Sequence, residues 1–356
     1  MALNYGSDKK HAVDALFDAQ KLAFAPIMFQ AAKSLRDLGI LEALKDNKDG
    51  LTIKQVAELV NVSVYGVKVL LEAGLSIELV YVKDDIFLLT KTGWYLLTND
   101  MTRANMDFTH DVNYKGMFTL TESIKTGVPT GLDEFGKWDT VYEALSELPK
   151  DVQKSWFAFD HYYSDTSFPV ILPLVFKDGA KTLLDVGGNT GKFSVECAKF
   201  NPDVKVTILD LPGQLAKANE YIKENNFEDR ISGHPINLLD HSKPFPKGND
   251  IIWMSQFLDC FSQEDVLELL KRGRAAMSED SSLYIMETYW DKQKFEASTY
   301  ALHATSLYFT NIANGCSQMY HSDDMINLVE KAGLYIDEAI DDVGVSHTLY
   351  KCKIKK

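Results

Sequence analysis

Residues 183–191, Leu-Leu-Asp-Val-Gly-Gly-Asn-Thr-Gly, decide the fold of this chain. An apolar run ends at Asp185 and breaks into a glycine-rich turn, and residues 192–200 then carry apolar side chains with helical spacing. Glycines let a backbone approach a ligand closely, and the N-terminus of a helix offers free N–H groups. The stretch therefore predicts a strand, a tight turn and a helix that together surround a ligand.

A second acidic residue, Asp210, follows the next apolar run, residues 204–209. The carboxyl ends of parallel strands form one edge of a sheet, and ligands of such sheets bind at this edge. A carboxylate at the second strand end suits a ribose, because it accepts hydrogen bonds from both hydroxyls. Asp185 and Asp210 together predict a nucleotide-type cofactor site in an α/β domain.

Strands and helices alternate from about residue 176 onward, which predicts a mostly parallel, doubly wound sheet covered on both faces. The expected strands are Thr182–Val186, Val204–Asp210, Ile231–Ile236, Asp250–Ser255 and Leu283–Glu287. The expected helices are Gly191–Phe200, Gln214–Asn225, Gln263–Met277 and Ser322–Ala332. Two last strands, Leu334–Ile340 and His347–Cys352, have no helix between them and are expected to form an antiparallel hairpin.

The N-terminal part predicts a smaller, mainly helical domain. Pro26 is expected to begin a helix, while Thr52 and Ser63 are expected to cap two more. The apolar runs 79–82 and 86–89 predict a hairpin, so that the whole pattern is that of a winged helix.

A winged helix binds DNA in some proteins and holds subunits together in others. The helix expected at Val64–Ala73 carries one basic residue, Lys68, against Glu72. The net charge of the whole chain is −14, and such a surface repels a phosphate backbone. We therefore expect no nucleic acid partner.

The 356 residues are enough for two or three domains, which we place at residues 1–104, 105–175 and 176–356. The middle segment is helical and rich in aromatic residues, most of which are expected to form core between the domains, although a pocket for a flat aromatic substrate would be lined in the same way. The four cysteines form no C-x-x-C pair, which favours a reduced, cytoplasmic protein. We find no signal peptide, membrane-spanning apolar run or cluster with metal-ligand spacing.

The motif Asp-Val-Gly-Gly-x-Thr-Gly, followed by Asp-Leu-Pro at residues 210–212, resembles the S-adenosylmethionine-dependent O-methyltransferases of plants and bacteria that act on small aromatic molecules. The resemblance covers nearly the whole chain, since the N-terminal part fits the dimerisation domain of that family. It implies a homodimer with a winged-helix dimerisation domain, a Rossmann-like methyltransferase domain and S-adenosyl-L-methionine as the cofactor. The competing cofactor, NAD or NADP, has the fingerprint G-x-G-x-x-G, whereas the spacing here is Gly-Gly-x-x-Gly.

The resemblance also implies roles for residues at the strand ends. Gly187 and Gly188, next to Asp185, approach the methionine part, and Asp210 binds the ribose with Leu211 beside the adenine. After the third strand the family has an acid that binds the adenine amino group. Here Asn237 stands in its place, followed by Leu238, and an amide oxygen accepts the same bond. Ser255 falls where plant members have a lysine.

The catalytic motif departs from the family. Its His-Asp-Trp motif matches Asp259-Cys260-Phe261, so Asp259 replaces the histidine base. Three alternatives remain. Asp259 is itself the base if burial raises its pKa; His161 or His303 supplies the base; or no strong base is needed, because proximity suffices or the acceptor is a ring carbon or an acidic hydroxyl. Glu287 matches the first of the glutamates that orient the base, and the second has no acidic counterpart near residues 315–318.

The sequence therefore predicts methyl transfer to the hydroxyl of a small aromatic or polyketide-like acceptor. Two other hypotheses stay open. One is C-methylation of a phenolic ring, and the other is a non-catalytic regulatory protein that binds S-adenosylmethionine.

Overall fold

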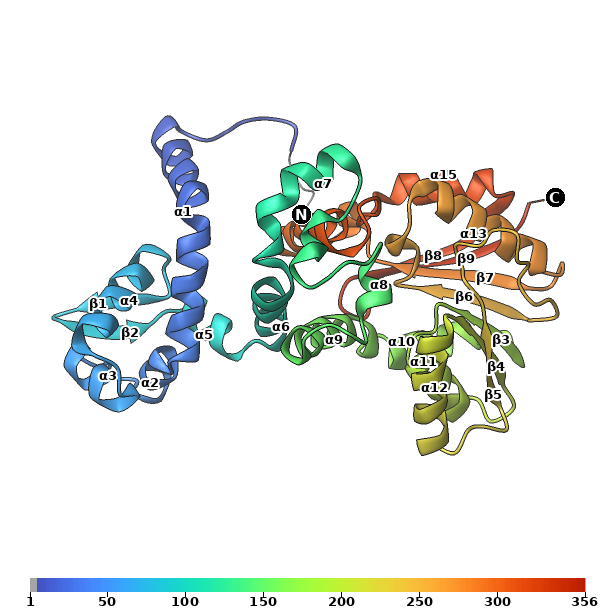
Figure 1. Cartoon of the computed structure of the whole chain (residues 1–356), viewed down its shortest axis with the longest axis horizontal. Helices are drawn as coiled ribbons and strands as arrows, with labels where there is room; N and C mark the ends of the chain where they lie inside the picture. The colour runs from blue at the N-terminus through green and yellow to red at the C-terminus, as the bar shows by residue number, and fades with distance from the viewer. Residues whose placement is uncertain (1–4, 356) are drawn as a thin grey trace. The chain divides into compact units, whose positions relative to one another are not determined.

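The structure, a computed structural model, describes residues 5–355, which form two compact units, residues 5–110 and 111–355 (Figure 1). The first unit is a helical domain with a two-stranded ribbon. Its elements are α1 (Ala12–Asp37), α2 (Ile40–Asp46), α3 (Ile53–Val60), α4 (Val64–Ser76), β1 (Val80–Lys83), β2 (Ile86–Leu89), α5 (Lys91–Thr98) and α6 (Asp100–Phe108). Leu35 of α1, Val56 of α3 and Leu71 of α4 meet in its core.

Side-chain caps set the helix starts in this unit. Thr52 accepts a hydrogen bond from the backbone of Gln55 and forms a capping box with it, and Ser63 accepts from Gly66. The prediction for Pro26 is wrong, because Pro26 lies inside α1 rather than at its start. Pro26 has no backbone N–H and therefore donates no hydrogen bond within the helix. Flanking residues of high helix propensity, such as Ala25 and Met28, keep the helix continuous on both sides.

The second unit is built on a seven-stranded sheet of order β5-β4-β3-β6-β7-β9-β8. The strands are β3 (Thr182–Val186), β4 (Lys205–Asp210), β5 (Ile231–Pro235), β6 (Ile251–Ser255), β7 (Ser282–Glu287), β8 (Leu334–Val343) and β9 (His347–Ile354). The strands from β3 to β7 pair in parallel, and β8 and β9 pair antiparallel to complete the sheet. The expected α/β class with its closing hairpin is confirmed.

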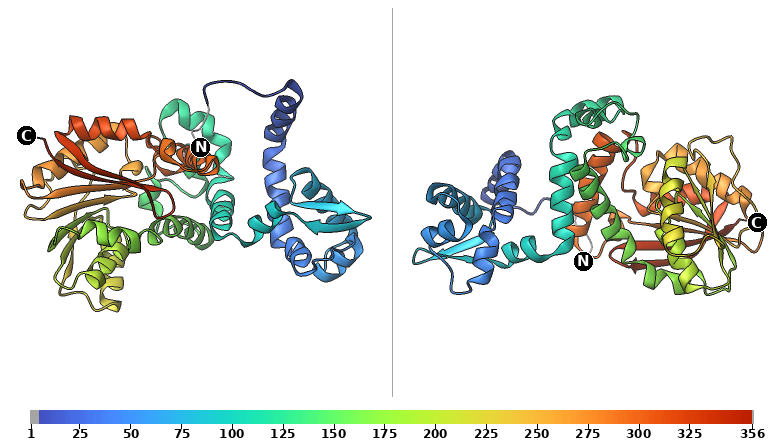
Figure 2. Two further views of the ribbon diagram at one scale, coloured as in Figure 1. Left: turned by 180° about the vertical axis from the view of Figure 1, so that it is seen from behind. Right: turned by 60° about the horizontal axis from the view of Figure 1, so that its bottom comes forward.

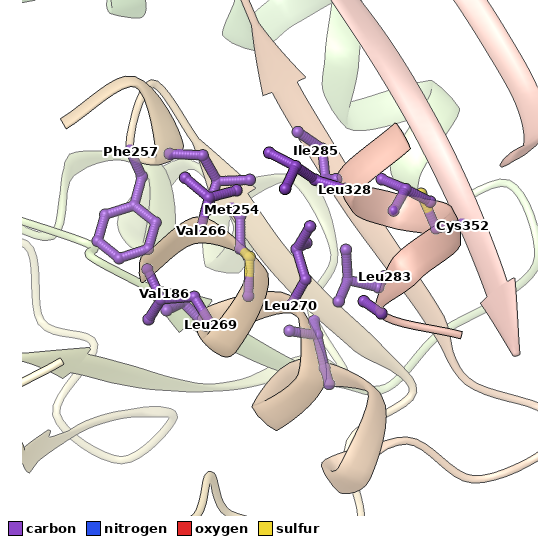
Figure 3. Close-up of a cluster of buried hydrophobic side chains, with 14 of the residues drawn as sticks. Val186, Met254, Phe257, Val266, Leu269, Leu270, Leu283, Ile285, Leu328 and Cys352 are labelled. Atoms are coloured by element: carbon purple, nitrogen blue, oxygen red, sulfur yellow. The ribbon is translucent and has the colours of Figure 1, made fainter. Parts of the chain in front are cut away.

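Helices cover both faces of this sheet, as Figure 2 shows from two further sides. One face packs against α10 (Phe168–Val175), α11 (Lys192–Phe200) and α12 (Pro212–Glu224), and the other against α13 (Gln263–Ala276) and α15 (Ser322–Lys331). Successive strand residues alternate between the two layers: Leu183 packs with α10 and α11, whereas Leu184 packs with α13. Figure 3 shows part of the second layer, in which Met254 and Leu283 pack against Leu270 of α13.

A helical layer from two distant parts of the sequence completes the second unit. Its elements are η2 (Gly116–Thr119), α7 (Leu120–Thr126), η3 (Thr130–Glu134), α8 (Val141–Ala144), α9 (Lys150–Asp165), α14 (Glu296–Tyr308) and η6 (Phe309–Ala313). Buried Asn311 joins the two parts, because its side-chain amide donates to the carbonyl of Gly116 at 2.8 Å and accepts from Ser123 at 2.8 Å. The indole N–H of Trp156 on α9 likewise donates to the hydroxyl of Tyr308 on α14 at 2.7 Å.

No single helix within residues 5–355 is long and apolar enough to cross a membrane. The helices α3 and α4, which are bent by 116° relative to each other, are long and apolar enough only when taken together.

Strand order reverses between β3 and β6, and cofactors of open α/β sheets bind at such a switch point, outside the carboxyl ends of the strands. We therefore look for the functional site where β3, β4, β6 and β7 end.

Candidate active site

The end of β3 carries a buried carboxyl group. Asp185 is buried, and its Oδ2 accepts a hydrogen bond from the hydroxyl of Ser194 on α11 at 2.6 Å. Burial raises the pKa of Asp185 to about 7, against the smaller opposing effect of that hydrogen bond. Asp185 therefore ties the strand to the helix across the glycine turn.

The two glycines of the turn lie where a side chain would clash with neighbouring atoms. Gly187 has a φ of +76°, and a Cβ there would lie 2.3 Å from Cδ2 of Phe257. A Cβ on Gly188 would lie 2.7 Å from Oδ2 of Asp185. The turn thus lies directly against Phe257, which belongs to the loop after β6, so the ends of β3 and β6 are in contact.

Asp210 ends β4 and organises the same turn. Its Oδ2 accepts from the backbone N–H of Asn189 at 2.8 Å, and its Oδ1 accepts from that of Leu211 at 2.7 Å. Burial raises the pKa of Asp210, and these two backbone bonds oppose the shift. Each carboxylate oxygen keeps one lone pair for a further hydrogen-bond donor. Asn189 has a positive φ, and its side-chain oxygen accepts from Gln214 of α12 at 3.0 Å.

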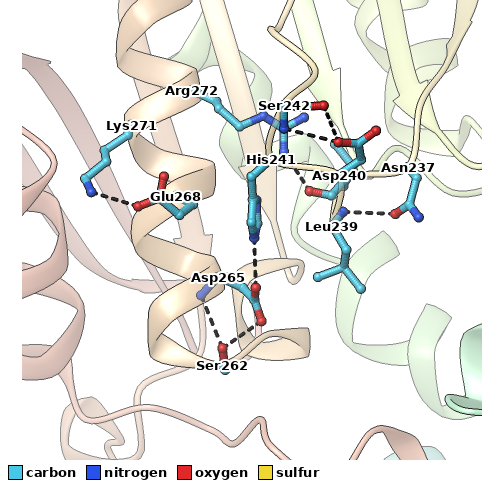
Figure 4. Close-up of polar contacts among 11 residues, drawn as sticks. Asn237, Leu239, Asp240, His241, Ser242, Ser262, Asp265, Glu268, Lys271 and Arg272 are labelled. Atoms are coloured by element: carbon cyan, nitrogen blue, oxygen red, sulfur yellow. Dashed lines mark hydrogen bonds and ion pairs between the residues drawn. The ribbon is translucent and has the colours of Figure 1, made fainter.

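The loop after β5 differs from the other strand ends (Figure 4). Asn237 is exposed, and its side-chain oxygen accepts from the backbone N–H of Leu239 at 3.0 Å. Leu238 is buried, and its carbonyl accepts from the guanidinium of Arg272 on α13 at 2.6 Å. Ser255 is half-buried where β6 ends. The amide oxygen of Asn237 thus has a partner in its own loop.

Glu287, at the end of β7, holds the loop that follows β6. Its Oε1 accepts from the backbone N–H groups of Phe257 at 3.0 Å and Leu258 at 2.8 Å. Its Oε2 is buried and has no hydrogen-bond partner among the described residues. Burial, and next the charge of Asp259, raises the pKa of Glu287 well above its usual range. Glu287 therefore orients the backbone that carries Asp259.

Asp259 lies in the short 3-10 helix η4 (Leu258–Cys260) and is 7% exposed. The thiol of Cys260 donates to its Oδ1 at 3.5 Å. Burial raises the pKa of Asp259 to about 6. A carboxyl group with this pKa is largely ionised at neutral pH, yet it binds a proton more readily than an exposed aspartate does.

A further carboxyl group, which the sequence pattern missed, approaches from α9. Burial raises the pKa of Asp160 to about 7, and next in size are the effects of the negative charges of Asp259 and Asp165. The middle of α9 therefore lies close to Asp259, across the carboxyl edge of the sheet. No local motif distinguishes Asp160, because its neighbours in the fold come from residues far away in the sequence.

The two candidate histidines lie in different surroundings. His161 is half-buried on α9, and its Nδ1 is 3.0 Å from the ammonium of Lys192, the first residue of α11. Lys192 also forms an ion pair with Asp165 at 2.8 Å. His303 is exposed on α14, and its ring packs on Trp290 with 5.0 Å between the centroids. The structure thus brings His161, but not His303, to the glycine turn through Lys192.

Known proteins resemble this chain in both units. An O-methyltransferase domain model matches residues 169–335, and a Dimerisation2-like domain model matches residues 17–87. The L-tyrosine C(3)-methyltransferase of Streptomyces lavendulae is 25% identical over 271 residues, 75% of this chain and 73% of that protein. The 3-amino-4-hydroxybenzoate 4-O-methyltransferase of Streptomyces cremeus is 24% identical over 243 residues, 67% of this chain and 63% of that protein.

Solved structures share the fold over nearly the whole chain. The S-adenosylmethionine-dependent methyltransferase SibL superposes with a TM-score of 0.74 and 22% identity, over 94% of this chain and 98% of that one. The O-methyltransferase domain match, together with these relatives, indicates an S-adenosylmethionine-dependent methyltransferase. Within that class, residues 169–335 match an O-methyltransferase domain and residues 17–87 match an N-terminal Dimerisation2-like domain.

Proposed function

We propose that this protein transfers the methyl group of S-adenosyl-L-methionine to the hydroxyl of a small aromatic or polyketide-like acceptor. One observation carries this proposal. The buried carboxyl group of Asp259 lies on the loop whose Phe257 contacts the cofactor turn at Gly187. A proton acceptor next to the cofactor turn is what methyl transfer to a phenol uses, because the phenol has to lose its proton.

The residues at the strand ends fit the cofactor. Asp210 offers one lone pair of each oxygen to the ribose, and Leu211 lies beside the adenine. Gly187, Gly188 and the end of β3 with Asp185 accommodate the methionine part. Leu238 lies on the adenine side, whereas Asn237 keeps one lone pair for the adenine amino group because Leu239 takes the other. Ser255, half-buried at the end of β6, is a further proposed contact of the cofactor.

The cofactor supplies an electrophilic methyl group, and the residues of the chain position and deprotonate the acceptor. Asp259 removes the hydroxyl proton, and its pKa of about 6 keeps it ionised but basic near pH 7. Glu287 is a positioning residue, because it holds the backbone of residues 257 and 258 by two hydrogen bonds. Asp160 lies close enough to Asp259 that, after burial, the charge of Asp259 is the next cause of the raised pKa of Asp160.

C-methylation is the second candidate reaction, because the relative from Streptomyces lavendulae is a tyrosine C(3)-methyltransferase. The same base serves it, since an ionised phenol is activated at its ring carbons. A panel of phenols and aromatic amino acids, assayed with labelled S-adenosylmethionine and mass spectrometry, separates the possibilities. A methyl ether supports the proposal, a methylated ring carbon supports the alternative, and cofactor binding without transfer to any phenol points to a regulatory protein.

The N-terminal unit is proposed to be a winged-helix module that forms a homodimer. The ribbon of β1 and β2 follows the helix pair α3 and α4, as the wing of such a module does. Large apolar side chains of α1 are exposed in the single chain, and the proposed occupant of this surface is a second copy. These side chains are Val13, Leu16, Phe17, Leu22, Phe24 and Ile27.

Light scattering at micromolar concentration tests the dimer. We expect twice the mass of one chain, and we expect the double variant Leu16→Glu, Phe24→Glu to shift the mass towards that of one chain. The double variant Glu58→Gln, Lys68→Gln, on exposed parts of α3 and α4, is the control and should leave the mass unchanged. A wild-type mass of one chain contradicts the proposal.

Domain limits, location and partners complete the proposal. The limits are those expected from the sequence: dimerisation at 1–104, the connecting and pocket segment at 105–175, and methyl transfer at 176–356. The cysteines are all unpaired in the structure, which supports a reduced, cytoplasmic location. The net charge of −14 supports a protein that binds neither nucleic acid nor an anionic membrane surface.

A further inference from the structure

The loop after β6 is held at its far end by Asn314, the residue that follows η6. The side-chain amide of Asn314 donates to the backbone carbonyl of Cys260 at 2.7 Å. Cys260 directly follows Asp259 and is the last residue of the short helix η4. Glu287 holds the beginning of the same loop through two backbone N–H groups. Asp259 therefore lies between two points at which other elements fix the backbone.

Hydrogen bonds within its own loop determine which way the amide of Asn314 points. One atom of the amide accepts from the backbone N–H groups of Cys316 at 3.0 Å and Ser317 at 3.1 Å. A backbone N–H only donates, so this atom is the oxygen, and the amide nitrogen faces the carbonyl of Cys260. Asn314 thus offers the Asp259 loop a donor, which an aspartate of the same shape would lack.

The backbone on both sides of Asn314 is itself anchored in the helical layer. Gly315 has a φ of +85°, and a Cβ there would lie 2.2 Å from the carbonyl oxygen of Gly127, which ends α7. Three residues before Asn314, buried Asn311 joins η6 to the same layer through its side-chain amide. Because these contacts fix Asn314, its amide restrains the Asp259 loop instead of moving with it.

We propose that Asn314 is a positioning residue for methyl transfer, because its amide holds the carbonyl of Cys260 and thereby fixes Asp259 where it takes the proton of the acceptor. The proposal rests on the function proposed above, in which Asp259 is the base. The amide of Asn314 itself neither gives nor takes a proton. A displacement of ~1 Å is enough to cost about 10²-fold in rate, so a single hydrogen bond on the neighbouring peptide has a measurable effect on turnover.

Two variants of the full-length protein remove the donor. Asn314→Asp keeps the shape and still accepts from the backbone of residues 316 and 317, but it turns an oxygen towards the carbonyl of Cys260. Asn314→Ala removes the whole group. Turnover is measured on the alkaline plateau of the pH profile, where Asp259 is ionised in every variant, and urea unfolding checks that each variant is folded.

Asn201→Asp and Asn201→Ala are the matched controls. Asn201 is half-buried like Asn314. Its amide donates to the carbonyl of Ala180 at 3.1 Å, and its oxygen accepts from the backbone N–H of Asp203 at 3.0 Å. These residues lie where β3 and β4 begin, at the opposite edge of the sheet. The controls therefore lose the same kind of hydrogen bond far from Asp259.

We expect both Asn314 variants to lower kcat for the phenol found by the acceptor panel roughly 10- to 100-fold, while the KM of that phenol changes less than about threefold. In the background of Asp259→Asn, the same changes should lower kcat less than about threefold, because displacing a residue that is no longer a base costs nothing more. The Asn201 variants should keep kcat within about twofold in both backgrounds. An unchanged kcat, or effects of Asn314 and Asp259 that multiply fully, overturns the proposal.

Hydrogen exchange of backbone amides tests the hold on the loop without any acceptor. By mass spectrometry, a peptide that covers residues 256–262 should exchange roughly 10-fold faster in the Asn314 variants than in the wild type and the Asn201 variants, because a loop that loses a hydrogen bond opens more often. Equal exchange overturns the proposal. Faster exchange in a protein that methylates no phenol would refute the proposed function, and with it the role in positioning a base, but not the hold of Asn314 on the loop.

Discussion

The ends of β3 and β4 and the ends of β6 and β7 lie at the same edge of the sheet, yet the carboxyl groups at the two pairs of ends differ in their hydrogen bonds. At the first pair, Asp210 accepts two backbone hydrogen bonds and Asp185 accepts one from Ser194. At the second pair, Oε2 of Glu287 has no partner among the described residues, and Asp259 has only a weak thiol donor at 3.5 Å. Burial raises the pKa of carboxyl groups on both sides, but on the β3–β4 side each carboxyl group accepts a short hydrogen bond, whereas on the β6–β7 side Oε2 of Glu287 accepts none and Asp259 has only the thiol donor.

This difference teaches where binding and chemistry reside. Carboxylates that already accept hydrogen bonds from the protein are held in one orientation. Such preorganised groups bind a cofactor with little loss of conformational freedom. Buried carboxyl groups with few partners hold a proton easily, and this is the property that a base requires. The predictions that follow test this division from the largest expected effect to the smallest.

The largest effect is expected on the β6–β7 side, from Asp259→Asn. The change keeps the shape and removes the base, so turnover of the accepted phenol should fall about 10²- to 10⁴-fold. Wild-type activity should fall as the pH drops through about 6, because protonated Asp259 accepts no proton, and the variant should lose this dependence. Rates across pH and calorimetry with S-adenosylhomocysteine check both. Near-normal turnover would leave Asp259 only as an acid at the start of α13.

The next effect belongs to the β3–β4 side. Asp210→Ala removes the acceptor for the ribose hydroxyls, so S-adenosylhomocysteine should bind about 1.5–3 kcal/mol more weakly. Asn237→Ala is the matched comparison. Because Leu239 already occupies one lone pair of its oxygen, we expect a loss of about 1 kcal/mol or less. Calorimetry gives both values, and equal losses would show that the adenine end matters as much as the ribose.

A smaller effect concerns the contact that joins the two sides. Gly187→Ala places a Cβ against Phe257 at a φ of +76°, and we expect a loss of about 1–3 kcal/mol in the free energy of unfolding. Gly213→Ala in α12 meets nothing within 4 Å and should be neutral or stabilising by up to about 1 kcal/mol. Urea unfolding of both variants measures this. If they behave alike, the close approach of Phe257 is not what requires glycine.

The smallest effect is a change in how stability depends on pH. Asp185 has a folded-state pKa of about 7, against about 4 in an unfolded chain, so the folded state binds more protons between these values. Stability should therefore fall as pH rises through about 7, and Asp185 should contribute about 1 kcal/mol of the loss between pH 6 and 8. Asp185→Asn should remove that part. Urea unfolding at both pH values tests it, and an unchanged slope would mean that Asp185 is ionised at pH 6.

Much of the fold could be predicted, because its signals are local. The helix start at Ser63 depends on a residue within three positions along the chain, and the strands around Asp185 and Asp210 show as apolar runs. The error at Pro26 has a local cause as well. A proline marks a helix start by preference only, and the flanking residues carried the helix through it.

The sequence by itself determined the class of the protein, because the glycine turn and the acidic strand ends are contiguous motifs whose geometry follows from backbone chemistry. Only the tertiary structure decided how the carboxyl groups and His161 behave. Burial and next the charge of Asp259 raise the pKa of Asp160, and burial and next the charge of Lys192, a residue 31 positions further along the chain, lower that of His161. Desolvation and charge act through space, so a motif names the residues of a site while the packing around them sets their chemistry.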